Sequence, residues 1–258
     1  MNDSFCVYGL NTPVLAQGDR ISQMIAAAAI VSTCDGIEDG DVIVIAESAV
    51  ATVEGRIVRL DQVTPSVQAE ELAGKYGMDP AVVEVVLRES DEVIGGIPGF
   101  LLSMKGGTLL PNAGVDASNA PEGCVLPLPA DPDASALEIR REIAGFTGAD
   151  TGVIIADSRT HAMRVGCSGV AIGCAGIPSV IDDRGRTDLF GRRLEVTRRA
   201  IADNIASAAE IVMGEADECV PAALVRGLGL PIGDTCGVET IDAEECLFMG
   251  LLSNRNRL

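Results

Sequence analysis

Apolar residues recur along this chain at two different spacings, and these spacings predict where helices and strands occur. In several segments an apolar residue follows at every third or fourth position, which is the period of an amphipathic helix. In others the apolar residues run consecutively or alternate, as they do in buried or half-buried strands. Helices are expected at residues 18–34, 66–76, 80–89, 132–146, 194–213 and 242–252. Strands are expected at residues 5–10, 41–46, 51–60, 151–156 and 222–226, with a glycine-rich β region at 92–115 and a small-residue segment at 165–176.

Capping residues support two of these helices. Asp79 precedes Pro80, and Asp131 precedes Pro132. Aspartate accepts hydrogen bonds from the free N–H groups that begin a helix, and proline fits the first helical position. Helices and strands mix along the chain without a strict β–α–β alternation. We therefore predict an α+β fold with mixed sheets and packed helices, formed as one domain over residues 1–258 whose two lobes interleave.

The composition restricts how the core is built and which partners fit. Hydrophobic residues make up 47% of the 258 residues, but aromatic residues only 3%, so Ala, Val, Ile and Leu must fill a tightly packed core. The formal net charge of −19 repels nucleic acids and anionic membranes, and neither is expected as a partner. Eight cysteines lack a C-x-x-C pair, and neither a secretory leader nor a bilayer-length apolar run occurs, which indicates a reduced, cytoplasmic protein.

Several common catalytic motifs are absent from the sequence. It contains no G-x-x-x-x-G-K-[ST] phosphate-binding loop, and no G-x-G-x-x-G that leads from a strand into a helix. His161 is the only histidine, which argues against a histidine-ligated metal and against a Ser-His-Asp triad. His161 follows Asp157 by four residues, so it is either a residue near a site or a structural or exposed one.

Three acidic segments carry the strongest indication of chemistry. Asp116 and Asp157 each follow an apolar, strand-like run, and the segment 213–218 comes at the end of the helix expected at 194–213. Carboxylates at strand ends are suitable ligands for Mg²⁺ or Mn²⁺, which prefer oxygen donors and are often held against phosphates. The simpler alternative is that these aspartates cap turns, because an aspartate side chain readily bonds its own backbone. Together the segments favour a metal-assisted phosphate site.

A series of short motifs in fixed order extends this interpretation. They lie at Tyr8–Pro13, Gly40–Ile45, Glu54–Arg56, Asn112–Asn119, Asp131–Ser135, Gly152–Ser158, Gly169–Gly173, Asp188–Arg192, Val212–Glu215 and Val225–Gly227. With these motifs the chain resembles the coenzyme F420-0:L-glutamate ligases (gamma-glutamyl ligase, CofE) from near residue 5 to about residue 228.

The resemblance implies a GTP-dependent ligase that adds L-glutamate, through a gamma-linked amide bond, to the deazaflavin coenzyme F420-0. The acceptor carboxylate would first be phosphorylated by GTP, and the amine of glutamate would then displace phosphate. Two Mg²⁺ or Mn²⁺ ions are implied, with K⁺ as a further candidate ion, and the protein is expected to be a homodimer. The implied metal ligands are Asp116 and Asp157 for one ion, and Ser158 and Glu215 for the other. The implied GTP contacts are Leu10, Asn11, Thr12, Pro13, Glu47, Ser48, Thr52, Asn119, Met213, Gly214, Glu215, Ala216, Asp217, Glu218, Cys219 and Val220.

Two departures from the family pattern fall at the implied site. Thr52 stands where the family usually has a lysine, and the family's D-T-x-G-R becomes Asp157–His161. Arg159, His161 and Arg164 are therefore candidates for contacts to substrate or phosphate. The departures leave open an amide ligase with another carboxylate acceptor and a non-catalytic ligand-binding homologue, and the choice between GTP and ATP also stays open.

The glycine-rich region at 92–115 is the expected dimer interface. Its apolar residues need a cover, which would be either a second copy or the chain's own helices.

Overall fold

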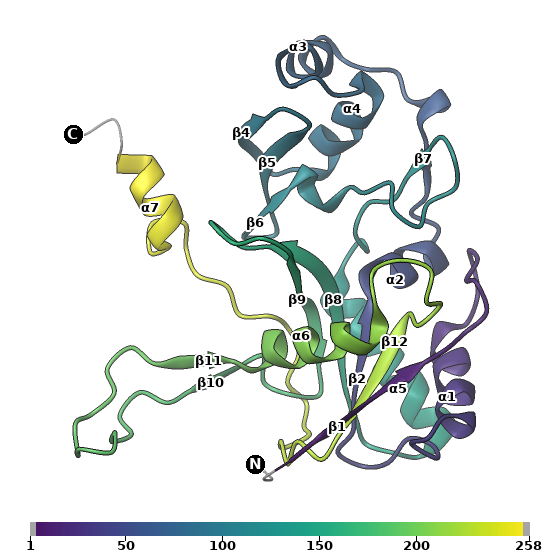
Figure 1. Cartoon of the computed structure of the whole chain (residues 1–258), viewed down its shortest axis with the longest axis vertical. Coiled ribbons are helices and arrows are strands. Elements are labelled where there is room, and N and C mark those ends of the chain that lie inside the picture. The colour runs from purple at the N-terminus through teal and green to yellow at the C-terminus, as the bar shows by residue number, and fades with distance from the viewer. Residues whose placement is uncertain (1–3, 255–258) are drawn as a thin grey trace. The chain divides into compact units, whose positions relative to one another are not determined.

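The structure is a computed structural model that describes residues 4–254, with side-chain surroundings up to residue 250. Helices and mixed sheets alternate irregularly along the chain, which confirms the predicted α+β class (Figure 1). The chain forms two compact units. The first consists of residues up to 56 together with 128–238, and the second of residues 57–127 together with those after 238. The units are thus interleaved in sequence.

A five-stranded sheet forms the centre of the first unit. Its strand order is β1-β12-β2-β8-β9. The strands are β1 (Cys6–Leu10), β2 (Val42–Ala46), β8 (Gly152–Thr160), β9 (Cys167–Ala175) and β12 (Ala222–Arg226). Strands β2 and β8 run parallel, whereas the other neighbours in this sheet run antiparallel.

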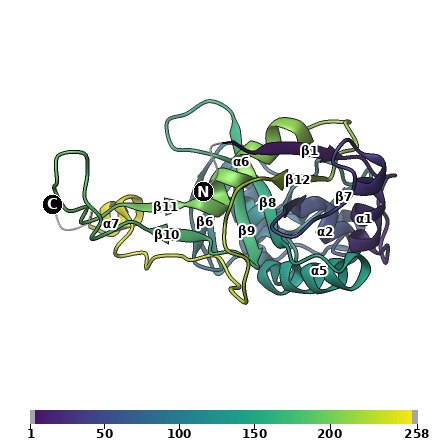
Figure 2. The same cartoon turned by 90° about the horizontal axis from the view of Figure 1, so that it is seen from below.

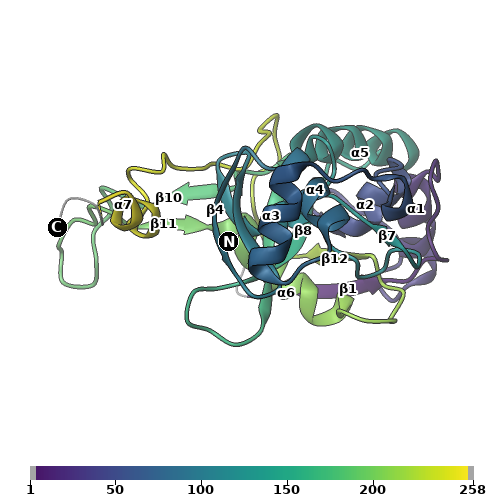
Figure 3. The ribbon, with the colours of Figure 1, turned by 90° about the horizontal axis from the view of Figure 1, so that it is seen from above.

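Helices cover both faces of this sheet. Helices α1 (Ile21–Val31) and α5 (Pro132–Thr147) pack on one face, and α6 (Ile201–Met213) packs on the other. Figures 2 and 3 show this three-layer arrangement from two opposite sides. Strand β2 serves both cores, because Ile43 and Ile45 face α1 and α5 while Val42 and Val44 face α6. A strand covered on both faces needs a continuous apolar run, which explains its sequence.

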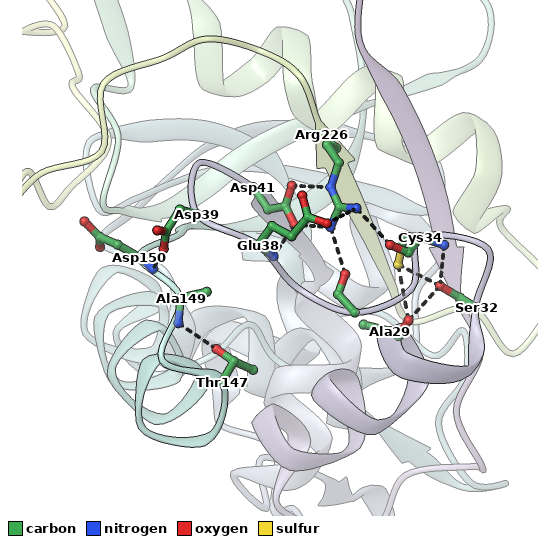
Figure 4. A network of polar contacts seen from close by, with 11 residues as sticks. Ala29, Ser32, Cys34, Glu38, Asp39, Asp41, Thr147, Ala149, Asp150 and Arg226 are labelled. Atoms are coloured by element: carbon green, nitrogen blue, oxygen red, sulfur yellow. Dashed lines mark hydrogen bonds and ion pairs between the residues drawn. The ribbon is translucent and has the colours of Figure 1, made fainter.

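A buried ion pair closes one edge of the sheet. Asp41 precedes β2 and is only 1% exposed, and Arg226 ends β12. Arg226 donates from Nε to Asp41 Oδ1 at 2.9 Å and from Nη2 to Asp41 Oδ2 at 2.7 Å. The same guanidinium donates to the carbonyl oxygens of Cys34 and Gly36, each at 2.8 Å. Figure 4 shows Arg226 between Asp41 and Cys34. The group is fully engaged in backbone and carboxylate contacts, so its role is structural.

The second unit is built around three antiparallel strands and two helices. The elements are β3 (Val58–Arg59), η1 (Leu60–Gln62), α3 (Val67–Tyr76), α4 (Pro80–Glu89), β4 (Glu92–Ile97), β5 (Phe100–Lys105), β6 (Thr108–Pro111), η2 (Asn112–Gly114), β7 (Cys124–Val125) and α7 (Leu247–Asn254). Leu101 of β5 packs with Ala69 and Ala73 of α3 and with Val83 and Val86 of α4. The chain's own helices therefore cover one face of the glycine-rich β region.

Several boundaries expected from the sequence were wrong. Residues 194–200 do not belong to α6, because β11 (Arg198–Ala200) pairs with β10 (Val180–Asp182) and forms a hairpin. In Figure 1 this hairpin and its loop extend away from the five-stranded sheet of the same unit. Of the strand expected at 51–60, only Val58 and Arg59 form a strand, because residues 51–53 end helix α2 (Glu47–Val53) and Leu60 begins a 3-10 turn. The last helix begins at Leu247 instead of residue 242. Val196 is 86% exposed, so its apolar character reflects no core contact.

None of the helices described between residues 4 and 254 has both the length and the apolar character that crossing a bilayer requires.

Candidate active site

Four of the predicted site segments meet at one edge of the five-stranded sheet. The pairing register places Leu10 beside Ala222, Ala222 beside Ile45, and Ile45 beside Ile155. The residues that follow β1 and β2, those beyond Ile155 in β8 and those that precede β12 therefore leave or enter the sheet at the same edge. These residues include 11–13, 47–48, 157–158 and 213–220, which were predicted separately from the sequence.

The two longest segments predicted to bind the nucleotide contact each other directly. The Thr12 N–H donates to the carbonyl of Cys219 at 3.2 Å, and Asn11 Nδ2 donates to the carbonyl of Glu218 at 3.3 Å. Gly214 has a φ of 75°, and a Cβ there would lie 2.3 Å from the Glu218 carboxyl carbon, so the turn after α6 requires glycine. The Glu218 carboxylate accepts from the Ala216 N–H at 2.8 Å, and this backbone hydrogen bond lowers the pKa of Glu218.

Helix α2 carries the remaining residues of the first unit that were predicted to contact the nucleotide. Glu47 and Ser48 begin the helix at the end of β2, and Thr52 lies in its last turn. Thr52 is half-buried, and its hydroxyl brings no positive charge to this edge. Any cation that meets a phosphate here must come from another residue.

Asp157 lies inside a strand rather than at its end, contrary to the sequence-based expectation. Strand β8 continues to Thr160, but its neighbour β2 stops at Ala46, opposite Ala156. Asp157 is thus the first residue of β8 beyond the edge of β2. Its Oδ2 accepts from Arg159 Nε at 2.7 Å, and the two side chains are only 14% and 12% exposed. Residues two apart on a strand share a face. Asp157, a predicted metal ligand, therefore contacts Arg159, a predicted phosphate contact.

The other two candidate contacts lie in the connection between β8 and β9. His161 Nε2 and Ser168 Oγ share a hydrogen bond of 2.6 Å; His161 is exposed and Ser168 is half-buried. Arg164 is also exposed, and its N–H donates to the carbonyl of His161 at 3.1 Å. Their substrate contact stays a prediction.

Glu210 is a site residue that the sequence analysis missed. It lies on α6 beside Ser158 and Glu215, the two residues predicted to hold the second metal ion. Burial, together with the neighbouring Glu215 carboxylate, raises the pKa of Glu210 to about 7, while the Ser158 hydroxyl opposes this shift. The sequence did offer a signal, because Glu210 is a single carboxylate in the otherwise apolar last turn of α6, Ala209–Met213.

Asp116 and Asn119 belong to the second unit, whereas the other predicted site residues belong to the first. Asp116 is exposed, and its Oδ1 accepts from the adjacent Ala117 N–H at 2.7 Å. This contact is the one expected if the aspartate bonds its own backbone in a turn, the simpler alternative to a metal ligand. The motif before it is strained, because Asn112, Ala113 and Gly114 have successive φ values of 50°, 53° and 74°. Consecutive left-handed residues outside glycine are costly and cluster at functional sites.

The oxygen donors around Ser158 fit a hard divalent cation. Ser158, Glu210 and Glu215 offer one hydroxyl and two carboxylates, which match the preference of Mg²⁺ and Mn²⁺. Glu210 Oε1 is buried and has no hydrogen-bond partner. Over the part of the chain that the structure describes, no group of three or more His, Cys, Asp and Glu side chains is arranged to hold a metal ion. The fit therefore rests on this mixed set of donors.

Comparison with known proteins identifies a family. The sequence model for the family described as F420-0:Gamma-glutamyl ligase matches residues 9–227. The chain is 47% identical to a coenzyme F420:L-glutamate ligase of Methanopyrus kandleri over 212 residues, which cover 82% of each protein. It is 43% identical to the protein of the same name from Methanocaldococcus jannaschii over 242 residues, covering 93% of this chain and 94% of the relative. The corresponding protein of Methanosarcina mazei is 38% identical over 248 residues, or 95% of each chain.

Proposed function

Because this chain belongs to the F420-0:gamma-glutamyl ligase family, we propose that it joins L-glutamate to coenzyme F420-0 through a gamma-linked amide bond and consumes GTP. The observation that carries this proposal is the meeting of residues 10–13, 47–48, 157–158 and 213–220 at one sheet edge. The matched region spans all four segments.

The proposed reaction has two steps. An oxygen of the acceptor carboxylate attacks the γ-phosphorus of GTP, the bond to the β-phosphate oxygen breaks, and GDP leaves with that electron pair. The product is an acyl phosphate. The amine of L-glutamate then attacks the acyl carbon, loses a proton, and displaces inorganic phosphate as the amide bond forms. Each turnover converts one GTP to GDP and phosphate.

Positioning and charge compensation are the main tasks of a protein in phosphoryl transfer. Asp157, Ser158 and Glu215 would hold the divalent cations, which neutralise charge on the transferred phosphoryl group when bound. The contact between residues 11–12 and 218–219 holds the nucleotide segments in one arrangement. The Arg159 guanidinium, paired with Asp157, is the cation of this edge that would approach a phosphate oxygen.

The assay follows the product and the nucleotide together. The purified protein is mixed with F420-0, L-glutamate, GTP and Mn²⁺, and the product is identified by mass spectrometry. We expect one added glutamyl residue for each GDP formed, and no turnover with Asp157→Asn. Glu138→Gln, an exposed change on α5, is the matched control and should retain activity. Replacing GTP by ATP tests the nucleotide.

A second candidate is an amide ligase with another carboxylate acceptor, which Thr52 and the segment Asp157–His161 favour because both depart from the family pattern. In that case GDP would form with a different acid but not with F420-0. Tight nucleotide binding without turnover on any carboxylate would instead identify a non-catalytic homologue and contradict both ligase proposals.

We also propose a homodimer. Within the second unit, Ile97 and Phe100 of the glycine-rich β region are 65% and 53% exposed, although helices cover the opposite face. Exposed apolar side chains grouped on one sheet support an interface with another copy of the chain.

A further inference from the structure

Helix α6 is fixed at close range to the β8–β9 hairpin. Ser158 of β8 pairs with Gly169 of β9, and a Cβ at Gly169 would lie 2.6 Å from the carbonyl carbon and oxygen of Ala206. The helix also donates from Ser207 Oγ to the Gly169 carbonyl at 2.8 Å. One turn before, Asp203 Oδ1 accepts from the Ala171 N–H at 3.0 Å. These contacts leave little freedom in the position of α6 on the strand.

The next turn of this helix carries Glu210. Residues three and four apart on a helix share a face, so Glu210 follows Ala206 and Ser207 toward the hairpin. Its carboxyl group reaches Ser158 and Glu215. The neighbouring Ile211 is 85% exposed. In this part of the helix the carboxylate therefore faces the protein and the apolar side chain faces solvent.

This arrangement is costly without a ligand. Glu210 Oε1 has no exposed surface and accepts no hydrogen bond, and the Glu215 carboxylate lies beside it. The Ser158 hydroxyl and the Gly169 N–H are the donors to the Glu210 carboxyl group, and no arginine or lysine of the described residues is among the groups that act on it. A buried polar atom without a partner and two adjacent carboxylates both destabilise a folded protein. A divalent cation would remove both penalties.

We infer that the Glu210 carboxylate directly binds the divalent cation that Ser158 and Glu215 hold. The inference rests on the proposed function for the presence of this ion. It adds a ligand from the helix to a set that otherwise comes from a strand and a turn. With Glu210, the site has two carboxylates and one hydroxyl, all hard oxygen donors.

Mn²⁺ binding to the whole protein tests the inference without reference to catalysis. Free Mn²⁺ is measured by electron paramagnetic resonance during titration of wild type, Glu210→Gln, Glu215→Gln and the control Glu138→Gln. Glutamine keeps the size of the side chain but removes its charge. We expect Glu210→Gln to weaken the binding of one Mn²⁺ ion by about 10-fold or more, and we expect the same of Glu215→Gln. Even loss of a residue that only hydrogen-bonds to a metal ligand lowers metal affinity by about 10–100-fold. Glu138→Gln should match wild type.

Thermal unfolding separates a ligand from a structural residue. Without metal, Glu210→Gln should unfold at the same temperature as wild type or higher, because an amide beside Glu215 can donate a hydrogen bond to that carboxylate and removes the contact between two acidic side chains. The rise in Tm that Mn²⁺ causes in wild type should shrink in this variant. A lower Tm without metal combined with wild-type Mn²⁺ affinity would overturn the inference, as would a wild-type protein that binds no Mn²⁺. If Mn²⁺ binding depends on Glu210 but no amide forms, the proposed reaction fails and the inference stands.

Discussion

At the scale of single residues, Asp157 combines a predicted metal contact with an observed ion pair to Arg159. We predict that Asp157→Asn lowers ligase turnover by about 100-fold or more, since a metal ion contributes several kcal/mol to such transition states. The resemblance to the family implies the same loss for Asp116→Asn. Turnover at saturating GTP and moderate Mn²⁺ is the measurement, with circular dichroism to confirm folding. Near-wild-type rates in either variant would remove that residue from the metal site.

Thr52 leads to a prediction about the nucleotide. A lysine there would add a positive charge to α2, the helix that begins with the predicted nucleotide contacts Glu47 and Ser48, in a chain whose net charge is −19. We expect Thr52→Lys to tighten GTP binding by about 10-fold or more, because hydrogen bonds to charged groups contribute about 1.5–3 kcal/mol. Isothermal titration calorimetry with GTP measures the change. Tight binding by wild type that the lysine does not improve would assign the role to another cation, with Arg159 and Arg164 as candidates.

The ion pair between Asp41 and Arg226 makes a prediction about stability. Arg226→Met should lower the free energy of unfolding by about 3–5 kcal/mol, because it leaves a buried carboxylate unpaired. Asp41 is 1% exposed and cannot recover solvent contact in the folded state. Urea unfolding measures the loss. The double variant Asp41→Leu with Arg226→Met should lose less than the sum of the two single changes, whereas additive losses would show that the pair is not coupled.

At the scale of elements, the contact between α6 and β9 depends on one glycine. Gly169→Ala places a methyl group 2.6 Å from helix backbone, so the helix or the strand must move. We expect a loss of about 1–3 kcal/mol in unfolding free energy, typical of an overpacked contact, and weaker Mn²⁺ binding as Glu210 shifts from Ser158. Denaturant unfolding and Mn²⁺ titration measure the two effects.

Gly145→Ala is the matched control for this change. A Cβ there meets nothing within 4 Å, and Gly145 lies inside α5. Alanine should therefore stabilise the protein by about 0.5–1 kcal/mol, because it restricts the unfolded chain and favours helix. Equal stability of the Gly169→Ala variant and wild type would show that α6 is not held by this approach.

The elements that could be predicted from sequence are those whose causes are local. Helices α3, α4 and α5 begin at Ser66, Asp79 and Asp131, whose side chains accept hydrogen bonds from the following N–H groups. The helix expected to begin at residue 194 begins at Ile201 instead. The spacing of apolar residues does not show whether they pack against other parts of the protein, and Val196 is exposed. Glu210 was missed for a related reason. Its environment comes from β8 and β9, which are distant in sequence.

At the scale of the whole molecule, we predict a homodimer through residues 92–115. Light scattering should give twice the chain mass of 26.7 kDa. Phe100→Asp should produce monomers, because it places a charge among exposed apolar side chains of β5. Phe190→Asp is the comparison, since Phe190 is 88% exposed in the loop between β10 and β11. Dissociation by Phe190→Asp alone would move the interface to that loop, and a single-chain mass for wild type would contradict the dimer.

The pairing of β1 with β12 also determines when the protein can fold during its synthesis. Leu10 can pair with Ala222, its partner in the sheet, only after Ala222 has left the ribosome. Residues 92–111 pair with neighbours in sequence and can close their sheet soon after they emerge. Until β12 arrives, the apolar strand β2 lacks its neighbour on one side. The nascent chain therefore exposes an aggregation-prone edge for most of its translation, and such chains are the ones that chaperones protect.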